Sequence, residues 1–273
     1  MLTESVTPSS LEPDIASYLD FLAEVAEARR DPLKMPEEME DFCRHHRAFG
    51  ICRLSGEADV DGFFHHLIQS ALTRRHYLQA AQAAGGGEPR YRRMSMLEPV
   101  FDAMAARQWR LATGLCQLMA QEWTEGEEYE DDFCYGDFLR RALSEPATDV
   151  TAPFSRWERV LDGATDHRLE VARSLAASQP EDFVAALHAL LRAADEEERT
   201  IADPVDGSVL AEELPFFPNH WVSIEGLALL ALAERRGIDL QGTLFSRCPP
   251  LARSGAFGPF RSLGYPFIEY VNE

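Results

Sequence analysis

The chain has 273 residues, of which 45% are hydrophobic, so it can bury a stable core without metal or disulfide support. It carries 26 lysines and arginines against 46 aspartates and glutamates, a formal net charge of -20. This balance disfavours direct binding to nucleic-acid phosphates, which requires clustered basic residues, and it would steer a basic protein partner toward the surface. The plainer interpretation is that an acidic surface keeps the protein dispersed.

The cysteines and the N-terminal segment indicate a soluble, cytoplasmic protein. Five cysteines, an odd number in a long chain, are unlike a disulfide framework. The first ten residues, MLTESVTPSS, lack the basic and apolar regions of a signal peptide. No apolar run reaches the ~18 residues of a membrane-spanning helix. We therefore expect no membrane partner.

Apolar residues recur at helical spacing through the N-terminal half of the chain. Helices are predicted over residues 14–30, ending before Pro32, over 37–54, over 60–84 and over 98–122. Three consecutive glycines, residues 85–87, stop the third of these. The residues expected to face inward are Ile15, Tyr18, Leu19, Leu22, Val25, Met39, Phe42, Cys43, Phe49, Phe101, Met104, Ala105, Leu111, Leu115 and Leu118.

Helical patterns continue in the C-terminal half, and alternating strand patterns are nearly absent. Three shorter helices are predicted at residues 131–145, 154–164 and 167–178. A longer helix follows over 178–200, with Ser178 and Glu181 spaced as a capping box and Pro180 at an early position.

The last long helix is predicted within residues 217–238, and the tail, residues 255–273, is expected to pack irregularly on the helices. Ser223 is placed to cap the start of that helix and Gly237 its end, while Gly226 indicates a close approach by another segment. We expect an all-α fold of antiparallel helices packed in pairs, compatible with a solenoid-like array. A single domain over residues 1–273 is favoured over a weak subdivision near 122–153.

Known catalytic and metal-binding signatures are missing from the sequence. It contains no GxSxG, HExxH or GxxxxGK[ST] motif, and Asp131-Asp132 lacks the third carboxylate of a DDxxD motif. Cys43 and His46 would share a helix face, but apolar neighbours bury Cys43 and the spacing is not that of a zinc site. We therefore expect a protein that is not an enzyme and has no catalytic residues, metal or cofactor.

One basic island surrounds the three glycines and consists of Arg74, Arg75, His76, Arg90, Arg92 and Arg93. Three glycines with no preceding strand are a weak phosphate-binding signal, so a flexible loop between helices is the preferred interpretation. The arginines are expected to pair with the protein's own acidic residues. A helical enzyme with an unrecognised site around His65, His66 and this island stays open as an alternative.

The strongest candidate for function is EWTEGEEYEDD, residues 122–132, which we call the acidic segment. Seven of its eleven residues are carboxylates, two are aromatic and none is basic. A solvated loop is the plainer interpretation. The functional one is a partner-binding surface, because aromatics supply contact area and carboxylates match a basic groove. The candidate residues are Glu122, Trp123, Glu125, Glu127, Glu128, Tyr129, Glu130, Asp131 and Asp132, with Glu127, Glu128, Glu130 and Asp131 given most weight.

SIEGLALLALAERRGI, residues 223–238, followed by CPPLAR, resembles the C-terminal motif of the immunity protein 49 family of bacterial polymorphic toxin systems. Asp131-Asp132-Phe133 and Phe138-Leu139 are similar to an earlier segment of that family. The resemblance spans roughly residues 95–255, and Pro250 departs from it. The matching positions of the motif are Ser223, Glu225, Gly226, Leu227, Ala228, Leu229, Leu230, Leu232, Ala233, Glu234, Arg235, Gly237, Pro249, Leu251, Ala252 and Arg253.

The resemblance implies an all-helical inhibitor encoded beside a secreted toxin, often one delivered by type VI secretion, with no catalytic residues. We expect an immunity protein that neutralises its toxin by direct contact, the toxin being a cytoplasm-acting nuclease or nucleotide-targeting effector. A helical scaffold or adaptor is the further alternative. The motif residues are expected to be structural: Ser223, Glu225, Gly226, Glu234, Arg235 and Gly237, with Glu225 and Glu234 orienting Arg235 or the arginines that follow.

Overall fold

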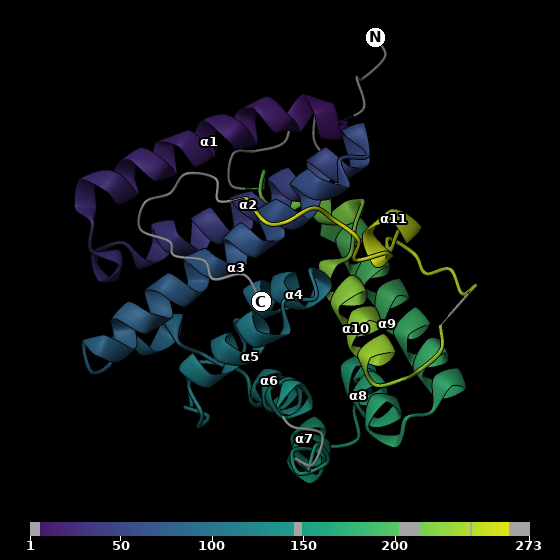
Figure 1. Cartoon of the computed structure of the whole chain (residues 1–273). Coiled ribbons are helices and arrows are strands. Elements are labelled where there is room, and N and C mark those ends of the chain that lie inside the picture. The colour runs from purple at the N-terminus through teal and green to yellow at the C-terminus, as the bar shows by residue number, and fades with distance from the viewer. Residues whose placement is uncertain (1–5, 145–148, 202–212, 241, 262–273) are drawn as a thin grey trace.

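The computed structural model describes residues 6–144, 149–201, 213–240 and 242–261. All regular structure in these ranges is helical, which confirms the all-α prediction. Figure 1 shows α1 to α3 along one side of the molecule, α8 to α10 along the other, and α4 to α7 between them. Within the same ranges, no helix is long and apolar enough to cross a lipid bilayer.

The first three helices are α1 (Pro8–Arg29), α2 (Pro36–Glu57) and α3 (Val60–Ala83), with short 3-10 helices η1 (Pro32–Lys34) and η2 (Pro89–Tyr91) at the connections. Their positions confirm the helical periodicity, although α1 begins six residues earlier than predicted because Thr7 caps it and Pro8 occupies its first position. The residues predicted to face inward are buried except at four positions, which are exposed or half-buried: Tyr18, Val25, Phe49 and Leu118.

The single helix predicted over residues 98–122 is wrong. The chain forms α4 (Glu98–Ala105) and α5 (Trp109–Leu118), separated by Arg107, whose φ of 57° is left-handed. The amide of Gln108 donates to the carbonyl of Ala103 (2.8 Å), so backbone bonds close α4 at this point. No glycine or proline marks the break in the sequence. Tertiary contacts offset the local strain, because the Arg107 guanidinium reaches Glu234 at 2.6 Å.

The remaining elements agree with the predicted order. They are α6 (Glu130–Leu143), α7 (Phe154–Leu161), α8 (His167–Ala177), α9 (Pro180–Ile201), η4 (Phe217–His220), α10 (Ile224–Arg235) and α11 (Pro250–Arg253). The predicted capping box at Ser178 is wrong, because Ser178 adopts a left-handed conformation (φ 53°) and ends α8 instead of starting α9. Pro180 does occupy the first position of α9.

Consecutive helices pack on one another, as α1 does on α2, α2 on α3, α4 on α5, α6 on α7 and α8 on α9. This arrangement confirms packing in pairs. Helix α10 departs from the order of a simple array, since it also packs against α4, far away in the sequence (Figure 1). The main apolar core runs from α1 to α11 and includes residues on both sides of 122–153. The division into one or two domains stays a prediction.

Helix α10 begins and ends as the sequence predicts. The Ser223 hydroxyl accepts a hydrogen bond from the amide of Gly226 (3.1 Å), and Gly237 ends the helix with φ of 82°. A Cβ on Gly226 would lie 2.7 Å from Cys248 Sγ and 3.0 Å from Leu191 Cδ2, which confirms the close approach.

Long-range contacts hold the start of the tail, at Phe257, and the end of α10, at Glu234. Phe257 stacks on Phe64 with ring centroids 4.5 Å apart, within an irregular stretch that confirms the prediction for residues 255–261. Residues 262–273 lie outside the described ranges. Glu234 pairs with Arg107 and, more distantly, with Arg253 at 3.7 Å, so it orients a downstream arginine and not Arg235.

All five cysteines are buried as free thiols, on α2, α5, α6 and the segment after α10. Burial raises the pKa of Cys134 to about 11 and that of the other four to about 12: Cys43, Cys52, Cys116 and Cys248. At neutral pH these side chains are therefore protonated, and they act as small apolar groups in the core.

A buried histidine of α2, His46, contacts a half-buried histidine of α3, His66, beside a smaller apolar cluster to which α1 and α2 contribute. The Nδ1 atoms of His46 and His66 lie 2.9 Å apart, and the two rings pack against Phe42 and Phe49 respectively. One ring must donate and the other accept, which requires that at least one is neutral. Burial lowers the pKa of His46 well below its ordinary value and that of His66 to about 3.

Acidification is therefore expected to destabilise the fold through this pair. In the unfolded chain both imidazoles bind protons near pH 6.5, whereas in the folded chain His66 does so only near pH 3 and the pKa of His46 is also well below its ordinary value. Stability is therefore lost as the pH falls below about 6.5 toward the pKa of the folded state. The loss is up to about 1.4 kcal/mol per pH unit for each histidine. Urea unfolding between pH 7 and 5 measures it. The His66→Gln variant should show a shallower pH dependence than the parent, and equal slopes would contradict the assignment.

Candidate partner-binding site

The first half of the acidic segment is a loop that is held in one conformation by its own aromatic residue. The indole Nε1 of Trp123 donates to the carbonyl of Glu128 (3.0 Å), and Gly126 turns the chain with φ of 85°. The loop is attached to the stretch before α4, where Arg93 Nη1 donates to the carbonyl of Glu127 (2.8 Å). Such attachment makes the loop a preorganised surface.

The second half of the acidic segment forms the first turn of α6, where carboxylates interact favourably with the helix dipole. Glu130 pairs with Arg156 at 2.6 Å, while Arg168 pairs with Asp131 at 3.1 Å and with Asp132 at 2.6 Å. Although burial alone would lower the pKa of Arg168, its hydrogen bonds to Asp132 and Asp166 raise it above the ordinary value. These carboxylates stabilise the fold around α6 to α8.

The four carboxylates given most weight in the prediction, Glu127, Glu128, Glu130 and Asp131, differ in whether they have partners within the protein. Glu130 and Asp131 have arginine partners, and Glu128 Oε2 accepts from the amide of Ser95 (2.8 Å). Only Glu127 has a side chain with no hydrogen bond or ion pair to the described residues. Next to it, Tyr129 is 80% exposed. The outer part of the segment consists of exposed or half-buried residues: Glu122, Glu125, Glu127 and Tyr129.

A hollow of about 780 Å³ lies between the acidic segment, α2 and the start of α4. Two of its carboxylates, Glu40 on α2 and Glu98 at the start of α4, were not predicted from the sequence, because they are distant from the segment along the chain. Two guanidinium groups, those of Arg44 and Arg93, also line it. The carboxylates are in excess: Glu40, Glu98, Glu127, Glu128, Glu130 and Asp132.

A smaller hollow of about 190 Å³ adjoins the first and shares Glu98 with it. Ser223 and Glu225, from the start of α10, line this second hollow. Burial raises the pKa of Glu225, whose Oε1 accepts a hydrogen bond from the Tyr135 hydroxyl (2.7 Å). The acidic segment and the start of α10 are about 90 residues apart in the sequence, and they are brought close together on opposite sides of Glu98.

The other motif residues lie away from both hollows. Gly226 packs inside the fold, Glu234 and Gly237 are at the far end of α10, and the Arg235 guanidinium lies 4.7 Å from the centroid of the Trp109 ring. These contacts support the structural role that was expected for them.

The buried ion pair of Arg47 with Asp102 holds Glu98 in place. Arg47 Nε and Nη2 donate to the two carboxylate oxygens of Asp102 at 2.7 and 2.9 Å, and the Ser70 hydroxyl donates to Asp102 Oδ2 at 2.5 Å. Arg47 also pairs with Glu98 at 3.2 Å. Although burial alone would lower the pKa of the Arg47 guanidinium, Asp102 and Glu98 raise it. The network fixes the position of the carboxylate that both hollows share.

The residues of the alternative enzyme site are not brought together. His66 is engaged with His46, and ten residues of helix, about 15 Å, separate His65 from Arg75. Within the basic island, Arg74 Nη2 donates to the carbonyl of Tyr91 (2.6 Å). Across the described part of the chain, no three His, Cys, Asp or Glu side chains are placed to hold a metal ion.

Comparison of the chain with protein-family models, with curated proteins and with solved structures finds no match in any of the three. The resemblance to the immunity protein 49 family therefore stays a prediction.

Proposed function

We propose that this protein is a cytoplasmic immunity protein that binds and neutralises a cognate secreted toxin, a nuclease or nucleotide-targeting effector. The observation that carries the proposal is the larger hollow, which six carboxylates and two guanidiniums line beside an exposed tyrosine. Three of these carboxylates also pair with arginines outside the lining, namely Arg47, Arg156 and Arg168. The family resemblance of residues 223–253 and the net charge of -20 point the same way.

The hollow has the physical properties of a surface that recognises a basic partner. Excess carboxylates attract a positively charged groove at long range and favour fast association. Tyr129 offers contact area at a low entropic cost, and the bonds of Trp123 and Arg93 hold the loop in place before binding. A nuclease presents such a basic groove to its substrate, so occupation of the groove by this surface would block the toxin.

Charge reversal at Glu127 should slow association, because this carboxylate is on the rim and has no internal partner to lose. The Glu127→Lys variant is expected to associate with the product of the neighbouring gene about tenfold more slowly at low ionic strength, with little difference in 1 M salt. Tyr129→Ala should instead speed dissociation. Stopped-flow kinetics measures both rates.

The matched control is Glu24→Lys, which makes the same charge change at an exposed position on α1. It should leave both rates near those of the parent. If Glu24→Lys and Glu127→Lys slow association equally, the effect is one of net charge and the site is wrong. If the parent neither co-purifies with that toxin nor rescues growth of cells that express it, the proposed function is wrong.

A further inference from the structure

A separate pocket of about 360 Å³ lies where α1 ends, η1 turns the chain and α2 begins, with α3 forming its other wall. Ala26, Met35 and Met39 contribute apolar side chains that are at most 5% exposed, and Pro32 adds a fourth apolar surface. Methionine side chains adapt to ligands of different shapes. The volume falls at the lower end of the range for small-molecule sites.

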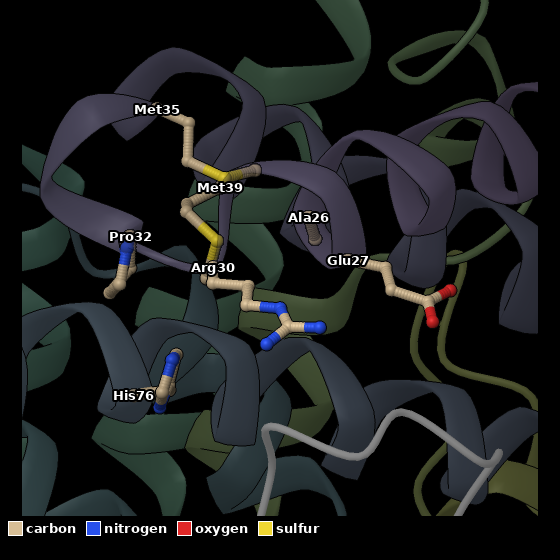
Figure 2. A pocket seen from close by; sticks show the side chains of 7 residues that line it. All are labelled: Ala26, Glu27, Arg30, Pro32, Met35, Met39 and His76. Atoms are coloured by element: carbon tan, nitrogen blue, oxygen red, sulfur yellow. The ribbon is translucent and has the colours of Figure 1, made fainter.

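The pocket has one cation that no other described residue neutralises. The Arg30 guanidinium makes no hydrogen bond and no ion pair within the described ranges, whereas the preceding residue, Arg29, pairs with Glu38 at 2.6 Å. Glu27 also lines the pocket but forms no ion pair with Arg30. Figure 2 shows the Arg30 side chain starting beside Met39 and extending away from the His76 ring toward the side on which Glu27 lies, with the Glu27 carboxylate directed to one side.

His76, on α3, adds a polar group without adding charge. Burial lowers the pKa of its imidazole, so the ring is neutral at physiological pH and can take part in hydrogen bonds. The pocket thus combines an apolar wall, the exposed guanidinium of Arg30, the carboxylate of Glu27 and one neutral ring. A net acidic protein would repel an anion elsewhere on its surface, so an available guanidinium beside apolar side chains is a selective feature.

We propose that this pocket binds a small amphipathic anion, a carboxylate on an aliphatic or aromatic body of about ten non-hydrogen atoms. The carboxylate accepts charge-assisted hydrogen bonds from Arg30, and the apolar body lies against Met35 and Met39. A purely apolar ligand would form no charge-assisted hydrogen bond with Arg30. The site is independent of the proposed toxin-binding surface, since no residue is common to the two.

Hexanoate and its neutral analogue hexanamide provide the test, titrated into the intact protein and followed by NMR or calorimetry. Hexanoate is expected to bind with a Kd of about 1 mM, and hexanamide about tenfold more weakly, because only the carboxylate forms the charge-assisted bond. The Arg30→Gln variant should remove this difference. The control, Arg159→Gln, removes an exposed arginine on α7 and should bind both compounds like the parent.

Three outcomes would contradict the proposal that Arg30 binds an anion in this pocket. Equal affinity of the parent for the two compounds, or an unchanged preference for hexanoate in Arg30→Gln, would overturn the proposal. Loss of binding in Arg159→Gln as well would show a nonspecific charge effect and also overturn it. The comparison of two ligands on the parent protein needs no variant, so it stands even if Arg30→Gln is poorly folded.

Discussion

The Asp102→Asn variant is expected to lose about 3–5 kcal/mol of unfolding free energy. Asp102 is fully buried and holds Arg47 through two hydrogen bonds of 2.7 and 2.9 Å. Asparagine keeps the shape of the side chain but removes its charge, which leaves the Arg47 guanidinium inside the protein with only the half-exposed Glu98 as an ionic partner. Urea denaturation followed by circular dichroism measures the loss.

Two further variants test whether the buried charge is the cause. Asp20→Asn makes the same change at an exposed position on α1 and should alter stability by no more than about 0.5 kcal/mol. The double variant Arg47→Met/Asp102→Leu removes both charges, so it should recover much of the loss. If the double variant is as unstable as Asp102→Asn, packing and not the unpaired charge governs this site.

Gly136→Ala should destabilise the protein by about 3 kcal/mol, although alanine favours helices over glycine. A Cβ at position 136, on α6, would lie 2.7 Å from the carbonyl oxygen of Met94 and in contact with the Met94 side chain. Since that oxygen belongs to the backbone, α6 and the stretch before α4 would have to separate. The acidic segment is attached to the same stretch, so the larger hollow would also change shape.

Gly114→Ala is the matched control, because it is the same substitution within a helix, α5, with no atom within 4 Å of the added Cβ. It should stabilise the protein by up to about 1 kcal/mol. Thermal unfolding of the two variants side by side distinguishes the two effects. If both glycine positions tolerate alanine equally, the close contact with Met94 does not contribute to stability.

Helices could be predicted from the sequence wherever local signals determine them. The glycines after α3 and the Ser223 and Gly237 caps of α10 act within a few residues, so their consequences are visible in the sequence. The break at Arg107 was missed because it depends on Glu234 and on α10, which are more than a hundred residues away. Ser178 was misassigned because a serine between two helices suits the start of one as well as the end of the other.

The candidate site could be predicted only in part, for a related reason. Composition identified the acidic segment, but it could not show that Arg156 and Arg168 neutralise three of its carboxylates. Nor could it place Glu98 beside both the segment and Glu225, because that arrangement depends on the packing of α10 against α4. Amphipathic periodicity shows which face of a helix is buried, and it carries no information on which helix covers that face.

The five buried thiols can report local unfolding of the segments that carry them. A cysteine whose thiol has a pKa of about 11 or 12 reacts with an alkylating reagent only after water and hydroxide reach it. The five lie at separate points of α2, α5, α6 and the segment after α10. Mass spectrometry of partly alkylated protein would therefore rank these regions by how often each one opens, with no residue replaced.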